Sequence, residues 1–405
     1  MRILMLSQFY PPTVGGEERH VADLSTELAA RGHQVAVATL WHKGFPRFEN
    51  GKGVRVYRIR GTLQRMPALF SYKERQFAPP FTDPEVLLAL RQIISEERPN
   101  IIHAHNWIVH SFTPLKAWSK ARLVMTLHDY SLVCVQKRLM HFGVRCSGPG
   151  FRKCLSCAAN FYGMGKGVPS TLANFTWGEI ERRAVDMFLP VSRSVAEQTR
   201  LALHRVPFRI IPNFIPDDVE EPEEDTEALL AQLPEKDFLL YVGDVMPDKG
   251  VGVLLQAHAK LKMPLVLIGR PVTGFLERLP PSVLHLGRWP HSAIMQAWSR
   301  CTLALIPSIC PDACPTVAME AMTMGRPIIA SRIGGLTDIV VDGQTGLLVS
   351  PGDCQELQGA IQSLLDDPER RACMTMMAKQ RVREFQAKSV VPHIEQVYRD
   401  LHPLG

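Results

Sequence analysis

Two carboxylates and the start of a helix stand together in the segment CTLALIPSICPDACPTVAMEAMTMG. Asp312 lies in a polar loop, and Glu320 lies one turn inside an expected helix whose first amides belong to Thr316 and Val317. Free amides at a helix N-terminus favour a phosphate. A carboxylate at Glu320 can accept hydrogen bonds from two neighbouring sugar hydroxyls, such as those of a ribose. The arrangement therefore indicates nucleotide binding.

A strand before this loop and a helix after it must position these residues. The run TLALIP is short, apolar and ended by Pro307, which is typical of a buried strand of a parallel sheet. The helix is expected to open at Pro315, because the missing amide hydrogen of proline would have no partner there in any case. Gly325 followed by Pro327 predicts its end.

The same alternation of apolar strands and amphipathic helices runs through the chain and predicts an α/β fold with parallel sheets covered on both faces. A first helix is expected from about Glu17 to Gly32. Ligands of such sheets bind outside the carboxyl ends of the strands. The expected strands are RILMLS, HQVAVAT, NIIHAH, RLVMTLH and DMFLPVS in the first half, and FLLYVG, PLVLIG, VLHLG, TLALIP and PIIAS in the second.

Other strand ends also carry residues suited to ligand binding. Gly15 and Gly16 follow the first strand, and paired glycines let a backbone approach a ligand closely, although an ordinary tight turn also uses them. His105 and His128 end two further strands, and Asp129 follows His128. A histidine there can donate to a sugar hydroxyl or polarise a reacting centre near neutral pH. The alternative is a purely structural histidine at each position.

Asp312, seven intervening residues and Glu320, together with the segments GRPIIAS, IGGLTDIV and DGQTGLLV, resemble the donor site of family 4 glycosyltransferases. That family has the GT-B architecture, in which two Rossmann-like domains with parallel sheets face a central cleft. Its usual signature is Glu-x7-Glu, whose second carboxylate holds the nucleotide ribose and whose first contacts the transferred sugar. Asp312 is shorter by one methylene. The resemblance covers most of the chain, as far as about Asp353.

The segment YVGDVMPDKG resembles the family's GR-x4-KG segment, in which an arginine and a lysine hold the donor diphosphate. Asp244 stands where the arginine is expected. Asp244 could face away, a basic residue such as Arg270 could replace the arginine, or donor binding could be weak or lost; we favour replacement. The resemblance implies donor contacts from Gly15, Gly16, Gly243, Lys249, Arg270, Pro315, Thr316, Val317 and Glu320.

The resemblance further implies catalytic roles for His128 and Asp312, which would orient the sugar, and acceptor-side roles for His105 and Asp129. The implied reaction moves a sugar from a nucleotide diphosphate sugar to a hydroxyl acceptor, which is lipid-linked, a polysaccharide or a small molecule, with retention at the anomeric carbon. The family needs no metal for donor binding. Two alternatives are a catalytically silent nucleotide-binding partner of an active transferase and, less favoured, a nucleotide-sugar 2-epimerase.

Three segments are expected from the order of the motifs. Residues 1–206 would form an N-terminal acceptor-side domain with a cysteine-rich insertion at 130–165, and residues 207–385 would bind the nucleotide sugar. By resemblance, a last helix within 386–405 would cross back to the first domain.

Charge is divided unevenly between the two halves of the chain. Residues 1–185 contain 25 Lys+Arg against 13 Asp+Glu, and the remainder contains 21 against 27. Nine basic residues fall between Trp41 and Pro80, where they could meet an anionic acceptor or a membrane surface, or simply form a solvated face. Nucleic acid is not expected, because no aromatic-basic interleaving accompanies the charge. With no apolar run long enough for a membrane span and no leader pattern, we expect a cytoplasmic protein, peripheral to the membrane at most.

Four of the nine cysteines form a cluster in CVQKRLMHFGVRCSGPGFRKCLSC. Cys134, Cys146, Cys154 and Cys157 have the spacing of a structural zinc knuckle. Unrelated thiols in a mobile loop and a disulfide pair are the alternatives. A bound metal would hold the insertion against the acceptor side.

Overall fold

The computed structural model describes residues 1–11, 15–66, 76–218, 226–272 and 279–403. The chain divides into two units, each built around one sheet. The first unit contains Met1–Phe142, Cys146–Asn213 and Val390–Gly405, and the second contains Gly143–Arg145 and Phe214–Ser389. The boundaries expected from the sequence fall at 206/207 and 385/386.

The seven strands of the first unit lie in the order β3-β4-β2-β1-β5-β6-β9, and every neighbouring pair is parallel except β3 with β4. The central strands read as apolar runs because both faces of the sheet are buried. The bounds are β1 Arg2–Ser7, β2 Gln34–Leu40, β3 Phe48–Gly51, β4 Val54–Ile59, β5 Ile101–Ala104, β6 Arg122–Leu127 and β9 Met187–Pro190.

Helices connect these strands, and a long helical excursion lies between β6 and β9. The excursion begins with the two-stranded pair β7 Met140–His141 and β8 Val144–Arg145 and continues with α5 and α6. The helices are α1 Gly16–Ala30, η1 Leu63–Arg65, α2 Pro84–Glu97, α3 Val109–Phe112, η3 Thr113–Leu115, α4 Lys116–Ser119, α5 Phe151–Tyr162, α6 Met164–Ala184, α7 Arg193–Gln198 and α15 Ala387–Leu401. From Val390 onward α15 belongs to the first unit, as the Tyr398 hydroxyl lies 2.6 Å from His103 Nδ1 of β5.

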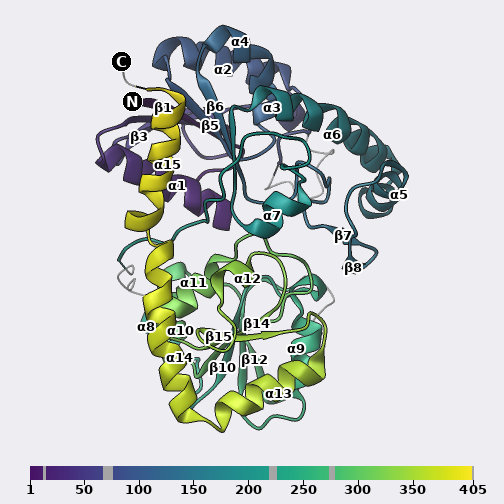
Figure 1. Cartoon of the computed structure of the whole chain (residues 1–405), viewed down its shortest axis with the longest axis vertical. Coiled ribbons are helices and arrows are strands. Elements are labelled where there is room, and N and C mark those ends of the chain that lie inside the picture. The colour runs from purple at the N-terminus through teal and green to yellow at the C-terminus, as the bar shows by residue number, and fades with distance from the viewer. Residues whose placement is uncertain (12–14, 67–75, 219–225, 273–278, 404–405) are drawn as a thin grey trace. The chain divides into compact units, whose positions relative to one another are not determined.

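The six strands of the second unit are all parallel, in the order β12-β11-β10-β13-β14-β15. Helices lie on either side of this sheet (Figure 1). The strands are β10 Leu239–Val242, β11 Leu265–Ile268, β12 Val283–His285, β13 Leu303–Ile306, β14 Ile328–Ser331 and β15 Gly346–Val349. The helices are α8 Thr226–Leu230, η4 Pro247–Lys249, α9 Val251–His258, α10 His291–Arg300, α11 Thr316–Thr323, α12 Leu336–Ile339, α13 Cys354–Leu365, α14 Pro368–Arg381 and η5 Val382–Phe385.

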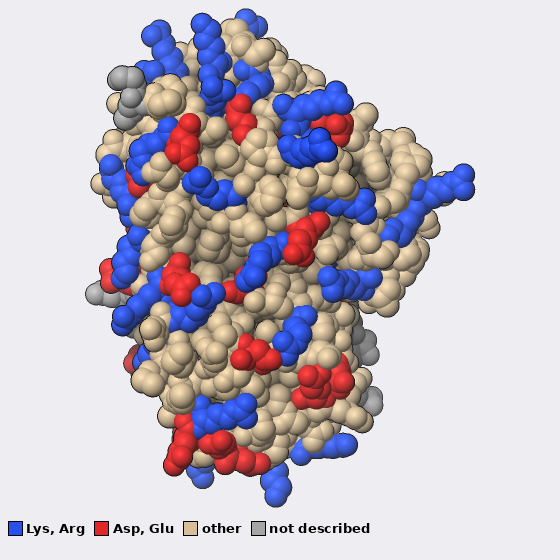
Figure 2. All heavy atoms as spheres, viewed as in Figure 1, with Lys and Arg blue, Asp and Glu red and all other residues tan. Residues whose placement is uncertain are grey.

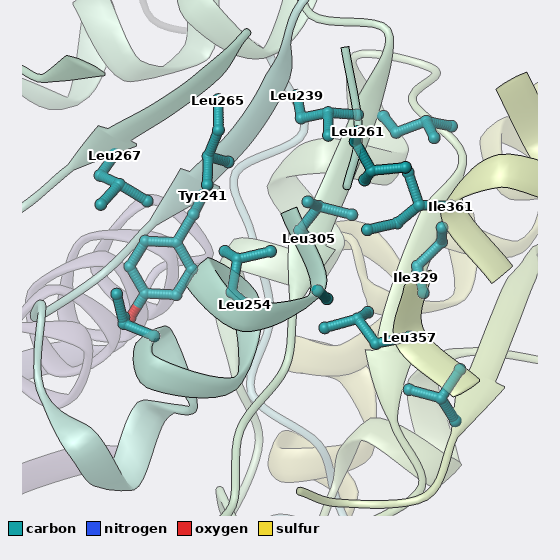
Figure 3. Close-up of a cluster of buried hydrophobic side chains, with 14 of the residues drawn as sticks. Leu239, Tyr241, Leu254, Leu261, Leu265, Leu267, Leu305, Ile329, Leu357 and Ile361 are labelled. Atoms are coloured by element: carbon teal, nitrogen blue, oxygen red, sulfur yellow. The ribbon is translucent and has the colours of Figure 1, made fainter. Parts of the chain in front are cut away.

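One apolar cluster holds the second unit together. Tyr241 of β10, Leu254 of α9, Leu305 of β13 and Ile361 of α13 converge in it (Figure 3). Each is at most 3% exposed. Burial of one such side chain contributes about 1.5–3 kcal/mol, so this cluster fixes the strand ends that carry the polar residues described next.

The ten expected strands are all present, with ends shifted by at most two residues, and the α/β architecture with parallel sheets is confirmed. Among the described residues, the strands β3, β4, β7, β8 and β15 were not predicted, and β15 lies at the edge of the second sheet. The helix expected to open at Pro315 begins at Thr316, with Pro315 as its N-cap.

Candidate active site

Residues that follow the strands of the six-stranded sheet gather at its carboxyl edge, and Gly243 and Arg270 of the predicted donor contacts are among them. Gly243 and Asp244 follow β10, Arg270 follows β11 after one glycine, and Ser308 follows β13 after one proline. Since parallel strands end at the same edge, these residues surround one region of the second unit.

Lys249 and Asp312 are paired at this edge, although 63 positions separate them in the chain. The other carboxylate oxygen of Asp312 accepts a hydrogen bond of 2.6 Å from the Ser308 hydroxyl. The amides of Ile309 and Cys310 donate to the Asp248 carbonyl oxygen at 2.9 and 3.0 Å. The loop after β13 is thus tied to the loop after β10 by main-chain and side-chain contacts.

Gly250 makes this close approach sterically feasible. Its φ is +74°, a conformation that side chains of L residues rarely adopt, and a Cβ atom there would lie 1.8 Å from the carbonyl oxygen of Pro307. The glycine after Lys249 is therefore required by the packing of two loops, whatever the ligand.

The Lys249–Asp312 pair controls the protonation of the lysine. Burial alone would lower the pKa of Lys249, but the Asp312 carboxylate raises it above its ordinary value. The pKa of Tyr241 is also raised, chiefly by burial and then by Asp312 and Asp244. Its hydroxyl donates to the Asp244 carbonyl oxygen at 2.8 Å. Lys249 stays charged, and Tyr241 stays neutral.

Asp244, which replaces the expected arginine, lies beside a cation. Its Oδ1 is 3.5 Å from Arg270 Nη2, and the two side chains are 51% and 58% exposed. Arg270, the base that was expected to replace the missing arginine, lies next to Asp244, and its role in donor binding stays a prediction.

Glu320 lies on the second turn of α11 and is 6% exposed. His291 Nε2, from the first residue of α10, is 3.4 Å from its Oε1. The first-turn amides of Thr316 and Val317 have no acceptor within the helix, and no side chain caps them at Pro315. The helix therefore offers two donors at its start and a buried carboxylate one turn further in.

The first unit carries a separate cluster of four histidines at the carboxyl ends of β5 and β6. His105 Nδ1 lies 3.0 Å from His128 Nε2, and their rings are stacked at 5.3 Å. The His20 ring of α1 meets the His128 ring at 4.9 Å, and the His103 ring meets the His105 ring at 4.3 Å. The structure therefore brings His128 and His105 together.

These histidines are neutral at physiological pH. Burial lowers the pKa of His128 to about 4 and that of His103 to about 3. Burial also lowers the pKa of His20 and of His105 well below the ordinary value, and neighbouring histidines lower both further. A neutral ring can donate from one nitrogen while accepting at the other.

Beside the histidines lies a mixed set of charges. Asp129 Oδ2 is 3.7 Å from Lys137 Nζ, and Asn106 donates to Glu17 in the first turn of α1. Burial, then Glu18 and Asp129, raise the pKa of Glu17 to about 8. Gly15 caps α1 with an extended φ of −168°, and a Cβ at Gly16 would meet open space, so neither glycine is required by backbone conformation.

The four clustered cysteines do line one small pocket of about 30 Å³. They are free thiols, and burial raises the pKa of Cys134 and Cys157. Within the described ranges, no three or more His, Cys, Asp or Glu side chains are arranged to hold a metal ion. The structure therefore does not support the predicted structural zinc at Cys134, Cys146, Cys154 and Cys157. Cys154 and Cys157 lie on helix α5.

The basic stretch between 41 and 80 is partly neutralised. Arg55, Arg58 and Arg65 are paired with Glu97, Glu49 and Glu85. Lys73 and Arg75 lie outside the described residues. Across the part of the chain that the structure describes, no helix is both long enough and apolar enough to cross a bilayer.

Sequence reasoning missed several residues of these sites, among them Ser308, His291, His20 and Glu17. The position of Ser308 just beyond a strand end was a usable signal, and Glu17 follows the glycine pair directly. His291 comes from a different helix than Glu320, and no pattern links the two positions in the sequence.

Comparison with known proteins adds family matches. The family model described as Glycosyltransferase Family 4 matches residues 14–219, and the model described as Glycosyl transferases group 1 matches residues 224–381. Glycogen synthase of Mycobacterium tuberculosis is 27% identical over 98% of the chain and 94% of that protein. N-acetyl-alpha-D-glucosaminyl L-malate synthase of Bacillus anthracis is 24% identical over 96% of the chain and 95% of that protein.

Solved structures agree with these matches at the level of the fold. Sucrose-phosphate synthase from Thermosynechococcus elongatus superposes with a TM-score of 0.76 at 21% identity, covering 98% of both chains. Anabaena HepE in complex with UDP-glucose superposes with a TM-score of 0.69 at 18% identity, covering 98% of this chain and 99% of that one.

Proposed function

The chain belongs to glycosyltransferase family 4, and on that premise we propose that it transfers a sugar from a nucleotide diphosphate sugar to a hydroxyl acceptor, with retention at the anomeric carbon. The observation that carries this proposal is the Lys249–Asp312 pair at the carboxyl edge of the second sheet, reached by the loop that leads into α11. That edge combines a cation, free helix amides and a buried carboxylate, which are the groups a nucleotide diphosphate requires.

The diphosphate would be held by Lys249, Arg270 and the amides of Thr316 and Val317, with Gly243 and Pro315 shaping the backbone around it. When it binds, Lys249 shares its charge between Asp312 and the phosphate oxygens. The positive groups then stabilise the charge that grows on the leaving diphosphate as the glycosidic bond breaks. Asp312, anchored by Ser308, would orient the sugar.

Glu320 would accept hydrogen bonds from the two ribose hydroxyls. His291, 3.4 Å away, would keep the carboxylate oriented in its buried position. Among the structural neighbours, HepE was solved with UDP and UDP-glucose and starch synthase IV from Arabidopsis thaliana with ADP. Both bases therefore belong in a donor screen.

On the first unit, His128 would contact the sugar as a neutral donor, held by its contact with His105 at 3.0 Å. Gly15, Gly16 and Asp129 would line the acceptor side. The acceptor hydroxyl would belong to a lipid-linked, polysaccharide or small-molecule compound.

Calorimetry with UDP, ADP and their hexose derivatives tests the donor site. We expect the wild-type protein to bind a donor without added metal. Glu320→Gln should bind it about tenfold more weakly, and the wild-type protein should lose a similar amount of affinity for a 2′-deoxyribose nucleotide. The variant should not distinguish ribose from 2′-deoxyribose. Absence of binding by every nucleotide would refute the proposal.

A catalytically silent nucleotide-binding partner is the second candidate, because Asp244 and Asp312 both depart from the family pattern. Product detection after incubation with a bound donor and a set of acceptors separates the two. Binding without transfer or donor hydrolysis would favour the silent partner.

A further inference from the structure

Helix α6 differs from an ordinary surface helix, because small and polar residues lie on its buried side and large apolar residues are exposed to solvent. Its buried positions hold small and polar residues, namely Gly167, Thr171, Asn174, Gly178 and Glu181. Its solvent side instead carries Met164, Leu172, Phe175 and Ile180, which are 76%, 47%, 40% and 42% exposed. A helix at the surface of a soluble protein normally presents polar residues to water.

The buried side of α6 is committed to its contacts, so the helix cannot turn its apolar side inward. A Cβ atom at Gly167 would lie 2.3 Å from the Ala158 carbonyl oxygen of α5, so α5 and α6 touch backbone to backbone there. The buried Glu181 carboxylate is held by a histidine, because its Oε2 lies 2.8 Å from His110 Nε2. These contacts fix the rotation of the helix about its axis.

The four exposed side chains lie together along the helix. At 3.6 residues per turn they fall within less than half of its circumference, and from Met164 to Ile180 they span about 24 Å. Phe151 of α5 extends the set, because its ring meets the Phe175 ring at 5.5 Å and remains 50% exposed. We call Phe151, Met164, Leu172, Phe175 and Ile180 the apolar face.

Basic residues border the apolar face. Arg152 is exposed and Lys153 and Lys166 are half-buried, whereas the exposed Glu179 and Arg183 fall within the same arc of α6 as the apolar residues and are paired with each other. Where Figure 1 shows α5 and α6, Figure 2 shows an uncharged surface from which basic side chains project. Exposed apolar side chains beside basic ones suit the boundary of headgroups and acyl chains, where buried apolar area and attraction to anionic lipid both contribute to binding.

We propose that α6 and the start of α5 dock on an anionic membrane surface, with the apolar face at the boundary of headgroups and acyl chains. The basic residues beside the apolar face favour a membrane, because anionic lipid headgroups carry the opposite charge. A second copy of the chain would instead place basic residues against basic residues. The docking does not depend on the transferase activity. If the proposed function also holds, the acceptor is a lipid-linked hydroxyl compound at that surface.

Vesicle sedimentation tests the docking. Wild type should bind vesicles of phosphatidylcholine with about 30 mol% phosphatidylglycerol, and bind phosphatidylcholine alone at least tenfold less, since each basic residue near an anionic surface contributes about 1 kcal/mol. The triple variant M164S/L172S/F175S should lose at least tenfold in binding. The matched control L88S/M376S replaces side chains that are 62% and 64% exposed on α2 and α14, and should bind as wild type does.

All five substitutions are at exposed positions, so an unchanged melting temperature and unchanged donor binding by calorimetry verify the fold of each variant. Equal binding by the triple variant and wild type, or no binding of wild type to anionic vesicles, would overturn the proposal. A wild-type dimer in light scattering that the triple variant abolishes would instead assign the apolar face to a second copy. Because donor binding is measured separately, failure of the transferase proposal leaves the vesicle result interpretable.

Discussion

Replacing Asp244 by asparagine should tighten donor binding. Its carboxylate stands at the edge where the diphosphate is proposed to bind, half exposed and 3.5 Å from Arg270. Two unit charges about 8 Å apart repel by about 0.5–2 kcal/mol for effective dielectric constants between about 80 and 20. Release of Arg270 from an exposed ion pair that is worth about 0–1 kcal/mol adds a smaller gain. The sum of about 0.5–3 kcal/mol corresponds to tighter binding by a factor between about two and about a hundred.

Calorimetry at low and high salt measures this effect on Asp244→Asn. The matched control is Asp237→Asn, because Asp237 precedes the same strand β10 at its opposite end, about 20 Å away along the extended chain. Only Asp244→Asn should gain affinity, and the gain should shrink at about 1 M salt, where charges are screened over about 3 Å. Unchanged affinity would place Asp244 away from the phosphates, and weaker binding would mean that Asp244 itself contacts the donor.

Three other substitutions test the structure directly. Gly250→Ala should destabilise the second unit by about 2 kcal/mol or more, because the position has a positive φ and an added Cβ atom would overlap the main chain. The control Gly252→Ala places its Cβ atom in open space inside α9 and should stabilise the unit by up to about 1 kcal/mol. Thermal melts measure both effects. Because Glu17 has a pKa of about 8 in the fold against an ordinary 4.5, the folded state holds the extra proton, so stability should fall as the pH rises from 4.5 to 8. Glu17→Gln should flatten that slope in melts recorded across this range, and an unchanged slope would refute the assignment. Tyr398→Phe should cost about 1–3 kcal/mol in denaturant unfolding by leaving His103 Nδ1 without its partner, and a neutral effect would contradict the hydrogen bond at 2.6 Å.

The strands could be predicted because parallel strands buried on both faces must be apolar runs. The strands within TLALIP and FLLYVG, β13 and β10, contain no charged residue and no alternation of apolar and polar residues, and both are central strands. The strand β4, VRVYRI, was missed because two arginines interrupt its pattern, and these arginines are held by Glu97 and Glu49 from other segments. Long-range ion pairs of this kind leave no trace in the local pattern.

The region from 130 to 184 is where sequence reasoning failed most clearly. Its cysteine spacing favoured a zinc knuckle in a loop, yet Cys154 and Cys157 lie on a regular helix, and the second helix packs through glycines. Helix α6 gives almost no periodic signal, because small and polar residues fill its buried side while Glu179 and Arg183 interrupt the apolar residues of its exposed side. The amphipathic pattern used to recognise surface helices expects polar residues on the exposed side, so it cannot identify a helix whose exposed side is apolar.

The candidate donor site carries paired charges before any donor arrives. Lys249 is neutralised by Asp312, and Arg270 by Asp244, so the edge of the sheet presents no net positive charge from these two cations. A small anion would have to break one ion pair to form one new contact with a cation, so its net binding free energy would be small. In the proposed binding mode, a nucleotide diphosphate would bring phosphates to Lys249, Arg270 and the helix amides together and ribose hydroxyls to Glu320. Only such a ligand replaces both pairs at once, so the carboxylates that weaken simple phosphate binding would make the site selective for the whole donor.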